Sequence, residues 1–168
     1  MKRIGLFYGK NTVKTASIAK KIQDAFGNVK IELISIEEAW QKDFEACDYL
    51  IAGASTWFDG ELPSYWDEII PVLSTLNLKD KKVAIFGLGD QVNYPDNFVD
   101  GIGLLAKAFE SAGAELVGST PINDYHFNQS LAKNREHFAG LAIDIENQPD
   151  KTDERIRIWV KKLKKNFM

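Results

Sequence analysis

The chain has 168 residues, a net charge of −3 and 45% hydrophobic residues, values that are ordinary for one folded domain. Its single cysteine, Cys47, excludes an internal disulfide, and we expect it to be a small buried residue. No signal peptide precedes the first strand-like segment, and no apolar run is long enough to span a membrane. We therefore expect a single domain over residues 1–168, in the cytoplasm and without membrane association.

Charge is distributed unevenly along the chain. Residues 59–68 contain four acids and no base, and residues 87–100 contain three acids and no base. Residues 151–168 carry seven bases against two acids, with the lysines near the end of a predicted helix, where the helix dipole favours them. Because these bases do not form a stripe with interleaved aromatics, we expect no nucleic-acid binding.

The first predicted elements are a strand, a turn and a helix. Ile4–Tyr8 is an apolar run with the length of a buried strand, Gly9 ends it, and apolar residues recur at helical spacing from Val13 onward. The turn between them consists of Lys10, Asn11, Thr12, Val13, Lys14 and Thr15. Since a helix N-terminus attracts negative charge, we expect an anion-binding turn. The alternative is that Asn11 or Thr12 only caps the helix.

The rest of the chain alternates between strand and helix patterns. Further strands are expected at residues 30–36, 48–53, 82–87, 115–118 and 140–145. Helices are expected at residues 63–73, 98–111 and 152–167. Pro71 should kink or shorten the first of these helices. Nearly continuous apolar strands that alternate with amphipathic helices indicate an α/β fold with a parallel sheet covered on both faces.

Other segments give weaker signals. Residues 119–138 show no clear period, which is typical of a functional loop or an insertion. No helix or strand is assigned to the acidic stretch at residues 37–46. We expect the tryptophans outside the loops to be packing residues, and the two histidines to be surface or packing residues rather than metal ligands. These residues are Trp40, Trp66, Trp159, His126 and His137.

Three loops should meet at one edge of the sheet. In such folds ligands bind outside the carboxyl ends of the strands, which brings together residues 9–15, 55–60 and 88–94. Trp57 and Tyr94 lie on the second and third of these loops. Two aromatics above an anion site favour a flat ring held between them, with a phosphate tail at the turn. The alternative for each aromatic is a rim position that covers apolar surface.

Several groups of residues carry a family resemblance. They are Thr56-Trp57 with Gly60-Glu61-Leu62, Phe86 to Gln91 with Tyr94 and Asp96-Asn97, Gly140-Leu141-Ala142, and Asn147-Gln148 with Lys151 to Arg155. In these residues the chain resembles the flavodoxins, specifically their long-chain subgroup, over essentially its whole length. The resemblance implies a flavodoxin-like doubly wound sheet of five parallel strands in the order 2-1-3-4-5. It also implies helices on both faces and an insertion of about 20 residues in the last strand.

The resemblance also implies a function. The ligand would be FMN, bound without a covalent bond, and the protein would be a low-potential one-electron carrier between a reductase and acceptor redox proteins, with no substrate turnover of its own. Trp57 and Tyr94 would sandwich the isoalloxazine, and the turn would hold the phosphate. The implied binding residues are Lys10, Asn11, Thr12, Val13, Lys14, Thr15, Ser55, Thr56, Trp57, Phe58, Asp59, Gly60, Leu88, Gly89, Asp90, Tyr94, Asn97 and Glu146.

Within that set the resemblance gives some residues a finer role. Asp90 and the backbone around Gly89 would meet the pyrimidine edge of the flavin. Thr56 and Glu146 would lie toward the ribityl chain, and Asn97 would lie near the flavin. The Phe58–Asp59 peptide carbonyl would turn to accept the proton that the ring gains on one-electron reduction.

Acidic residues on these loops suggest how the potential and the partners are set. Like charge disfavours the anionic, fully reduced flavin, which lowers its potential. The same charge would attract basic redox partner proteins to the flavin edge, and we expect the chain to be a monomer. The acids concerned are Asp59, Glu61, Asp67, Asp90 and Asp96.

The phosphate turn departs from the family pattern at two positions. Val13 stands where flavodoxins usually have glycine, and we expect its branched side chain to resist a positive φ and to narrow the approach to the phosphate. Lys10 replaces a hydroxyl and would pair with the phosphate or point into solvent. These changes leave open a flavodoxin-fold protein with weakened or lost FMN binding that acts through protein contacts. An FMN enzyme such as a quinone reductase is a third possibility.

Overall fold

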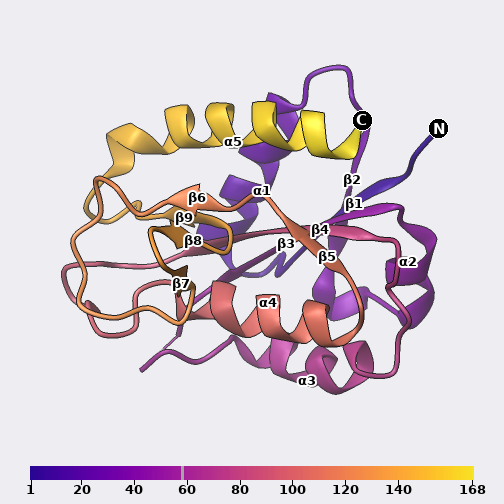
Figure 1. The fold of residues 1–168 in the computed structure, drawn as a ribbon, viewed down its shortest axis with the longest axis horizontal. Coiled ribbons are helices and arrows are strands. Elements are labelled where there is room, and N and C mark those ends of the chain that lie inside the picture. The colour runs from indigo at the N-terminus through magenta and orange to yellow at the C-terminus, as the bar shows by residue number, and fades with distance from the viewer. Residues whose placement is uncertain (58) are drawn as a thin grey trace.

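A parallel sheet with helices on both faces forms the centre of the molecule (Figure 1). The computed structural model describes residues 1–57 and 59–168. The strands run in the order β2-β1-β3-β4-β5, which confirms the predicted order. Their bounds are β1 Ile4–Tyr8, β2 Ile31–Ser35, β3 Tyr49–Ser55, β4 Lys82–Leu88 and β5 Glu115–Val117.

The last strand position of the sheet is divided between two segments. β5 pairs in parallel with the first part of β4, where Lys82 lies opposite Glu115, and β9 (Leu141–Ile143) pairs with the last part, where Phe86 lies opposite Leu141. The residues between them form a small antiparallel sheet in the order β6-β8-β7. Its strands are β6 Thr120–Pro121, β7 Lys133–Asn134 and β8 His137–Phe138. The predicted insertion into the last strand is therefore confirmed.

Two pairs of helices cover the sheet. α1 (Val13–Ala25) and α5 (Thr152–Phe167) lie on one face, and α3 (Ser64–Leu73) and α4 (Asp100–Ser111) lie on the other (Figure 1). Pro71 lies inside α3, which ends two residues later. The short elements are η1 Ile36–Glu38, α2 Gln41–Ala46 and η2 Pro149–Lys151. Within the described part of the chain, every helix is too short or too polar to cross a membrane.

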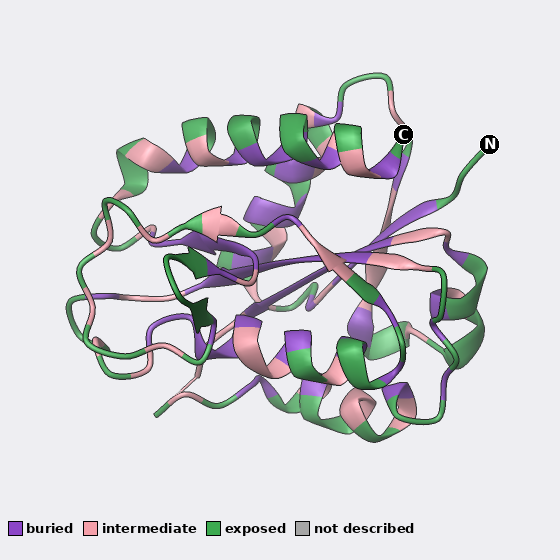
Figure 2. Ribbon diagram, in the orientation of Figure 1, coloured by how far each residue is buried: buried purple, intermediate pink, exposed green. Residues whose placement is uncertain are grey.

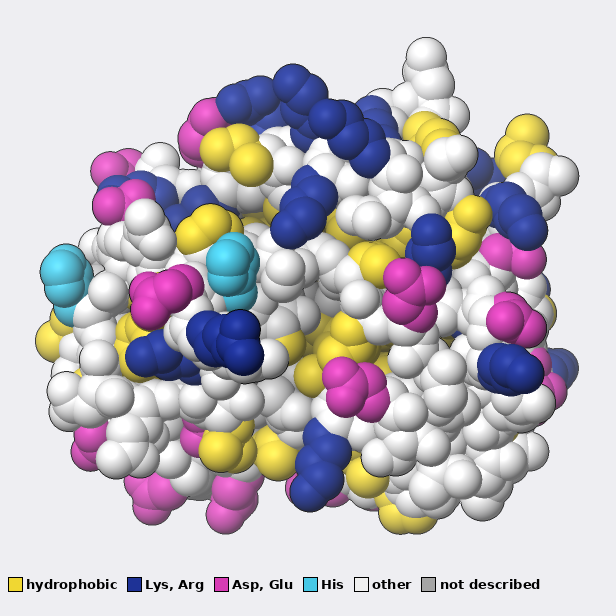
Figure 3. Space-filling model, viewed as in Figure 1, with side chains coloured by type: hydrophobic (Ala, Val, Ile, Leu, Met, Phe, Trp, Pro, Cys, Tyr) yellow, Lys and Arg dark blue, Asp and Glu magenta, His cyan; other side chains and the backbone are white. Residues whose placement is uncertain are grey.

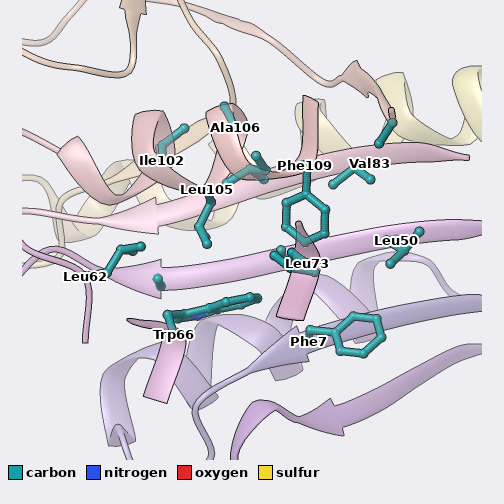
Figure 4. Close-up of a cluster of buried hydrophobic side chains, with 14 of the residues drawn as sticks. Phe7, Leu50, Leu62, Trp66, Leu73, Val83, Ile102, Leu105, Ala106 and Phe109 are labelled. Atoms are coloured by element: carbon teal, nitrogen blue, oxygen red, sulfur yellow. The ribbon is translucent and has the colours of Figure 1, made fainter. Parts of the chain in front are cut away.

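The sheet separates two hydrophobic cores, and its strands are mostly buried (Figure 2). Beneath α3 and α4, Trp66, Leu73 and Phe109 pack over the strands with Phe7 close by (Figure 4). Trp66 Nε1 donates a hydrogen bond of 3.0 Å to the Gly53 carbonyl, so its one polar group is satisfied inside the core. The second core lies beneath α1 and α5 and contains Ile18, Ile22, Trp159 and Leu163.

Most of the expected packing residues lie where they were predicted. Cys47 is buried, and burial raises the pKa of its thiol to about 11, as suits an unreactive side chain. Trp66 and Trp159 are buried, and both histidines are exposed. The prediction for Trp40 is wrong, because its side chain is 71% exposed. Trp40 lies between η1 and α2, in the acidic stretch where no element was predicted.

Replacement of Phe109 by alanine should measure how strongly the core beneath α4 stabilises the fold. Phe109 is fully buried against Trp66 and Phe44, so Phe109→Ala should lower the free energy of unfolding by about 3–5 kcal/mol. Urea denaturation followed by circular dichroism measures the change. Ile158→Ala, at a side chain that is 55% exposed, is the control and should change stability by about 0.5 kcal/mol or less. Equal losses in the two variants would contradict this packing.

Candidate cofactor site

The turn between β1 and α1 is shaped by a close approach of Tyr65. A Cβ atom on Gly9 would lie 2.4 Å from the Tyr65 ring, so a larger residue at this position would force that ring to shift. Thr12 occupies the N-cap position, but its side chain makes no capping hydrogen bond. Instead Thr12 Oγ1 lies 2.9 Å from the Tyr65 hydroxyl. The turn therefore keeps the free N–H groups at the start of α1 that an anion would use.

A buried pair of hydroxyls joins this turn to the end of β3. Thr15 is fully buried, and its Oγ1 lies 2.8 Å from Ser55 Oγ. The pair fixes the first turn of α1 against the loop that follows β3. Hydroxyl groups at this position suit a phosphate, because each can donate one hydrogen bond and accept others.

Both lysines of the turn are paired with carboxylates. Lys10 forms an ion pair with Glu38, and Lys14 forms one with Glu146 at the far end of the sequence. The Lys10 backbone N–H also donates a 3.4 Å hydrogen bond to Glu37. Burial raises the pKa of Glu37, but hydrogen bonds from Ser35 and from the backbone of Lys10 and Asn11 outweigh it and lower the pKa below its ordinary value.

Glu37 and Glu38 were missed by the sequence analysis, although a signal was present. β2 pairs in parallel with β1, so the residues that follow the two strands lie side by side. The acidic stretch after β2 should therefore have been placed next to the anion turn.

Val13 has no positive φ, in agreement with the expectation that its branched side chain resists one. It is the first residue of α1 and has helical geometry, so no positive φ is required there. Its side chain is 81% exposed and points away from the core. The narrowing of the approach to the phosphate by Val13 stays a prediction.

The loop after β3 is closed by a tight backbone bridge. Trp57 and Glu61 exchange two backbone hydrogen bonds of 2.7 Å, and Gly60 provides the positive φ of 94° that the reversal needs. The Trp57 ring packs edge-on against Tyr65, with 6.0 Å between centroids. Tyr65 is thus a further aromatic of this region that the sequence analysis missed. Phe58, and with it the predicted Phe58–Asp59 peptide geometry, lies outside the described residues.

Two predicted residues, Thr56 and Asn97, make hydrogen bonds that join neighbouring segments of the chain. Thr56 Oγ1 accepts a 2.9 Å hydrogen bond from the Gly101 N–H at the start of α4. Asn97 Nδ2 donates to the Asp59 carbonyl at 3.1 Å and to the carboxylate of Asp100 at 3.2 Å. Both contacts fix the loop after β3 against α4.

Asp90 is the acid most firmly held in the loop after β4. Its carboxylate accepts hydrogen bonds from the N–H groups of Val92 and Asn93 and from the side chains of Asn93 and Asn147, at 2.7–3.1 Å. Burial alone would raise the pKa of Asp90, but these hydrogen bonds hold it below its ordinary value. Asp90 therefore carries a full negative charge at neutral pH.

Parts of the three loops surround one cleft of about 240 Å³. Tyr94, at the end of the third loop, is 52% exposed. The cleft is lined by Lys14, Ser55, Thr56, Leu88, Gly89, Asp90, Tyr94, Ile145 and Glu146, all predicted except Ile145. Of the other predicted residues that the structure describes, the following lie on the turn, the loops or next to them without lining the cleft: Lys10, Asn11, Thr12, Val13, Thr15, Trp57, Asp59, Gly60 and Asn97.

The donor set fits a phosphorylated ligand with a flat ring. The start of α1, the Thr12 hydroxyl and the Thr15–Ser55 pair supply hydrogen bonds for an anion, and Tyr94 offers a half-exposed ring beside them. The cleft lies at the carboxyl ends of β3 and β4, where doubly wound proteins hold their nucleotides. Fold and site together define a doubly wound, nucleotide-binding class of α/β protein.

Comparison with known proteins identifies the family. The family model described as Flavodoxin matches residues 6–159, so the chain belongs to the flavodoxin family. It is 49% identical to a flavodoxin of Synechococcus elongatus over 168 residues, with 99% of each chain covered. It is 44% identical to a flavodoxin of a Nostoc species over 166 residues, with 99% and 98% covered.

A solved structure agrees with this assignment. The crystal structure of Fusobacterium nucleatum flavodoxin bound to flavin mononucleotide superposes with a TM-score of 0.93 at 29% identity, with 99% of both chains covered. As a member of this family the chain is an electron-transfer flavoprotein and not an enzyme with a substrate of its own.

The hydrogen bonds to Asp90 generate a pH prediction. A depressed folded-state pKa contributes stability above about pH 4, which is lost as the pH falls through the folded value. Asn93→Ala removes one donor and should raise the pKa of Asp90 toward its ordinary value. A carbon-13 NMR titration of the Asp90 carboxyl group measures this, with Asn123→Ala as the control. An unchanged Asp90 midpoint in Asn93→Ala would show that the other donors suffice.

Proposed function

We propose that this electron carrier holds its FMN without a covalent bond, with the phosphate at residues 10–15 and the flavin at the 240 Å³ cleft. The observation that carries the proposal is the convergence of the Thr12 hydroxyl, the Thr15–Ser55 pair and the start of α1 beside a cleft that Tyr94 lines. The bound FMN of the Fusobacterium nucleatum protein supports the same assignment. The remaining predicted residues complete the site as the family resemblance implies.

Trp57 and Tyr94 are proposed to hold the two faces of the flavin ring. They lie on the loops after β3 and β4, whose ends are adjacent because Ser55 pairs with Leu88. Tyr65 packs against Trp57 and bonds to Thr12, so it couples the aromatic side of the site to the phosphate side. Asp90 and Gly89 line the same cleft, which supports their proposed contact with the polar edge of the ring.

The charge of the surrounding loops supports a low potential. FMN supplies the one-electron chemistry, and the protein adjusts its energy through nearby charge. Asp90 lines the cleft and is held ionised, and Asp59, Glu61, Asp67 and Asp96 are exposed on the flanking loops and α3. Their negative charge opposes the build-up of charge on the reduced ring.

Redox proteins are the partners that the family assignment implies, and we propose that they are basic where they touch this chain. Figure 3 shows Asp and Glu side chains along the lower left edge, and Lys and Arg side chains gathered over α5 at the top. The loops that follow β3 and β4 lie on the left side of the same view (Figure 1). We further propose that residues 1–168 act as one monomeric domain in the cytoplasm.

One observation favours the second candidate, a flavodoxin-fold protein with weakened FMN binding. The Glu37 carboxylate accepts hydrogen bonds from the turn that would hold the phosphate, and both turn lysines are paired with carboxylates. An anion of the protein itself therefore competes for the same donors. The competition would lower affinity for FMN without altering the ring site.

Titration of the stripped protein with FMN distinguishes the two candidates. FMN should quench tryptophan fluorescence at micromolar concentration, and Glu37→Gln should tighten its binding by about threefold to tenfold, because the competing anion is removed. Riboflavin, which lacks the phosphate, should bind Glu37→Gln and the unchanged protein equally. Glu45→Gln, an exposed acid on α2, is the control. An absence of quenching at micromolar FMN would support the weakened carrier instead.

Electron transfer to a basic acceptor tests the partner surface. The reduced protein should reduce cytochrome c at a rate that falls as ionic strength rises from about 0.01 to 0.15 M, since screening removes the attraction. Glu61→Gln with Asp67→Asn should slow the low-salt rate severalfold. Glu110→Gln, near the opposite end of α4 from the cleft, is the matched control. A rate that does not depend on salt would contradict basic partners.

A further inference from the structure

Tyr65 lies where the two halves of the proposed site meet. It is the second residue of α3, and the hydroxyl end of its ring lies against Gly9 in the turn between β1 and α1. The same ring packs edge-on against Trp57, with 6.0 Å between centroids. Tyr65 does not line the cleft that the described residues form. Its influence on a flavin held there therefore passes through Trp57 and the turn.

The neighbours of Tyr65 hold it in place. Trp66, the next residue, is fully buried, and its Nε1 donates a 3.0 Å hydrogen bond to the Gly53 carbonyl in β3. The N–H groups of Trp66 and Asp67 donate to the Pro63 carbonyl at 2.9 and 3.2 Å, which closes the first turn of α3. Because this turn is fixed to the sheet, the phenol of Tyr65 is held against the turn before α1.

The hydroxyl of Thr12 takes its orientation from Tyr65. The backbone of Thr12 is fixed on both sides, since its N–H donates to the Gly9 carbonyl at 3.2 Å and its carbonyl accepts from the Ala16 N–H at 2.9 Å. Its side chain makes no capping hydrogen bond within the described residues. Thr12 Oγ1 lies instead 2.9 Å from the Tyr65 hydroxyl, and this contact sets the direction of its proton.

The protonation state of Tyr65 suits a hydrogen-bond donor. Burial and the nearby charge of Glu37 raise the pKa of Tyr65, and the hydrogen bond with Thr12 does not offset them, so the phenol stays protonated at neutral pH. A hydroxyl donates one proton and accepts through its lone pairs. When an anion accepts the Thr12 proton, Thr12 Oγ1 is left to accept from Tyr65. Hydrogen bonds aligned in one direction strengthen each other.

We propose that Tyr65 is a positioning residue that selects flavins carrying a phosphate, because it directs the Thr12 hydroxyl proton toward that phosphate. The inference rests on the proposed function, which places the phosphate at residues 10–15. The ring of Tyr65 supports Trp57 whichever flavin is bound, whereas its hydroxyl acts at the phosphate end alone. A residue of α3, outside both the turn and the cleft lining, thus contributes to the preference for FMN over riboflavin.

Tyr65→Phe separates the hydroxyl from the ring. Isothermal titration calorimetry of the stripped protein should show FMN binding about threefold to tenfold more weakly in Tyr65→Phe, the range expected for one hydrogen bond, with riboflavin affinity changed by less than about twofold. Tyr49→Phe is the matched control and should change neither affinity. Tyr49 stacks on Phe167 at 4.7 Å and begins β3, at the opposite end of that strand from Ser55.

A double-mutant cycle tests the route through Thr12. Thr12→Val should weaken FMN binding by about tenfold or more, because a hydrogen bond to a charged group is lost. Since the Thr12 side chain does not cap α1, we expect the melting temperature to be retained. Tyr65→Phe added to Thr12→Val should change FMN affinity by less than about twofold, because the hydroxyl that Tyr65 directs is no longer present.

Inorganic phosphate tests the same contact without a flavin. It should shift the amide NMR signals of residues 12–16 in a saturable way, and Tyr65→Phe should weaken its binding about threefold to tenfold. If the unchanged protein binds phosphate but not FMN, the proposed function fails, and the phosphate titration alone decides the role of Tyr65. If it binds neither, both proposals fail.

Three results with Tyr65→Phe would overturn the inference. Unchanged affinity for FMN or for inorganic phosphate would show that the hydroxyl does not act at the phosphate end. Equal losses for FMN and riboflavin would reduce Tyr65 to a structural residue of the fold. A full loss that persists in the Thr12→Val background would show that Tyr65 acts by a route other than Thr12.

Discussion

The edge of the molecule that holds the cleft depends on one buried carboxylate, that of Asp144. It follows β9, is fully buried, and accepts hydrogen bonds from the Gln91 backbone at 3.1 Å and side chain at 2.7 Å, and from the Asn147 backbone at 3.0 Å. The Gln91 side chain in turn accepts a 2.6 Å bond from the His126 backbone. One charge therefore fixes the loop after β4, the end of β9 and the insertion relative to one another. Without these partners the Asp144 carboxylate would be buried with no hydrogen bonds, and its desolvation would strongly destabilise the fold.

The divided last strand explains how a long insertion coexists with a fixed site. β5 and β9 each pair with β4, and the cleft borders the part of β4 that β9 covers. The Gly89 N–H, directly after β4, donates a 3.0 Å hydrogen bond to the Ile143 carbonyl at the end of β9. The chain thus leaves the sheet after β5 and returns to it at β9, directly before Ile145 and Glu146, which line the cleft. The geometry of the cleft is set by the sheet, and the insertion adds a second surface against α5.

Much of the fold could be predicted from the sequence because its strongest signals are local and periodic. The apolar run Ile4–Tyr8 and the helix Thr152–Phe167 lie where their patterns placed them. α2 was missed because it has only six residues, too few for a helical period, and the strands of the insertion have two residues each. Trp40 was predicted to be a packing residue without a predicted element to place it. It lies directly before α2, the short helix that was missed, and its side chain is exposed.

The site was predicted as a set of loops but not as a set of contacts. Strand order placed the loops at one edge of the sheet, and most residues of the cleft were foreseen for that reason. The partners of those residues come from elsewhere in the chain and carry no local pattern. Tyr65 over Gly9 and Glu37 beside Lys10 depend on packing between separate segments.

The basic end of α5 and the acidic loops give the molecule a permanent electric dipole moment. The lysines of α5 lie toward its C-terminal end, while the acids of the loops after β3 and β4 lie at the carboxyl edge of the sheet (Figures 1 and 3). In the field of a charged body such a molecule experiences a torque as well as a force. It turns the edge that holds the cleft toward positive potential before contact, so with FMN bound there as proposed, a larger share of collisions with a basic partner would begin with the flavin facing forward.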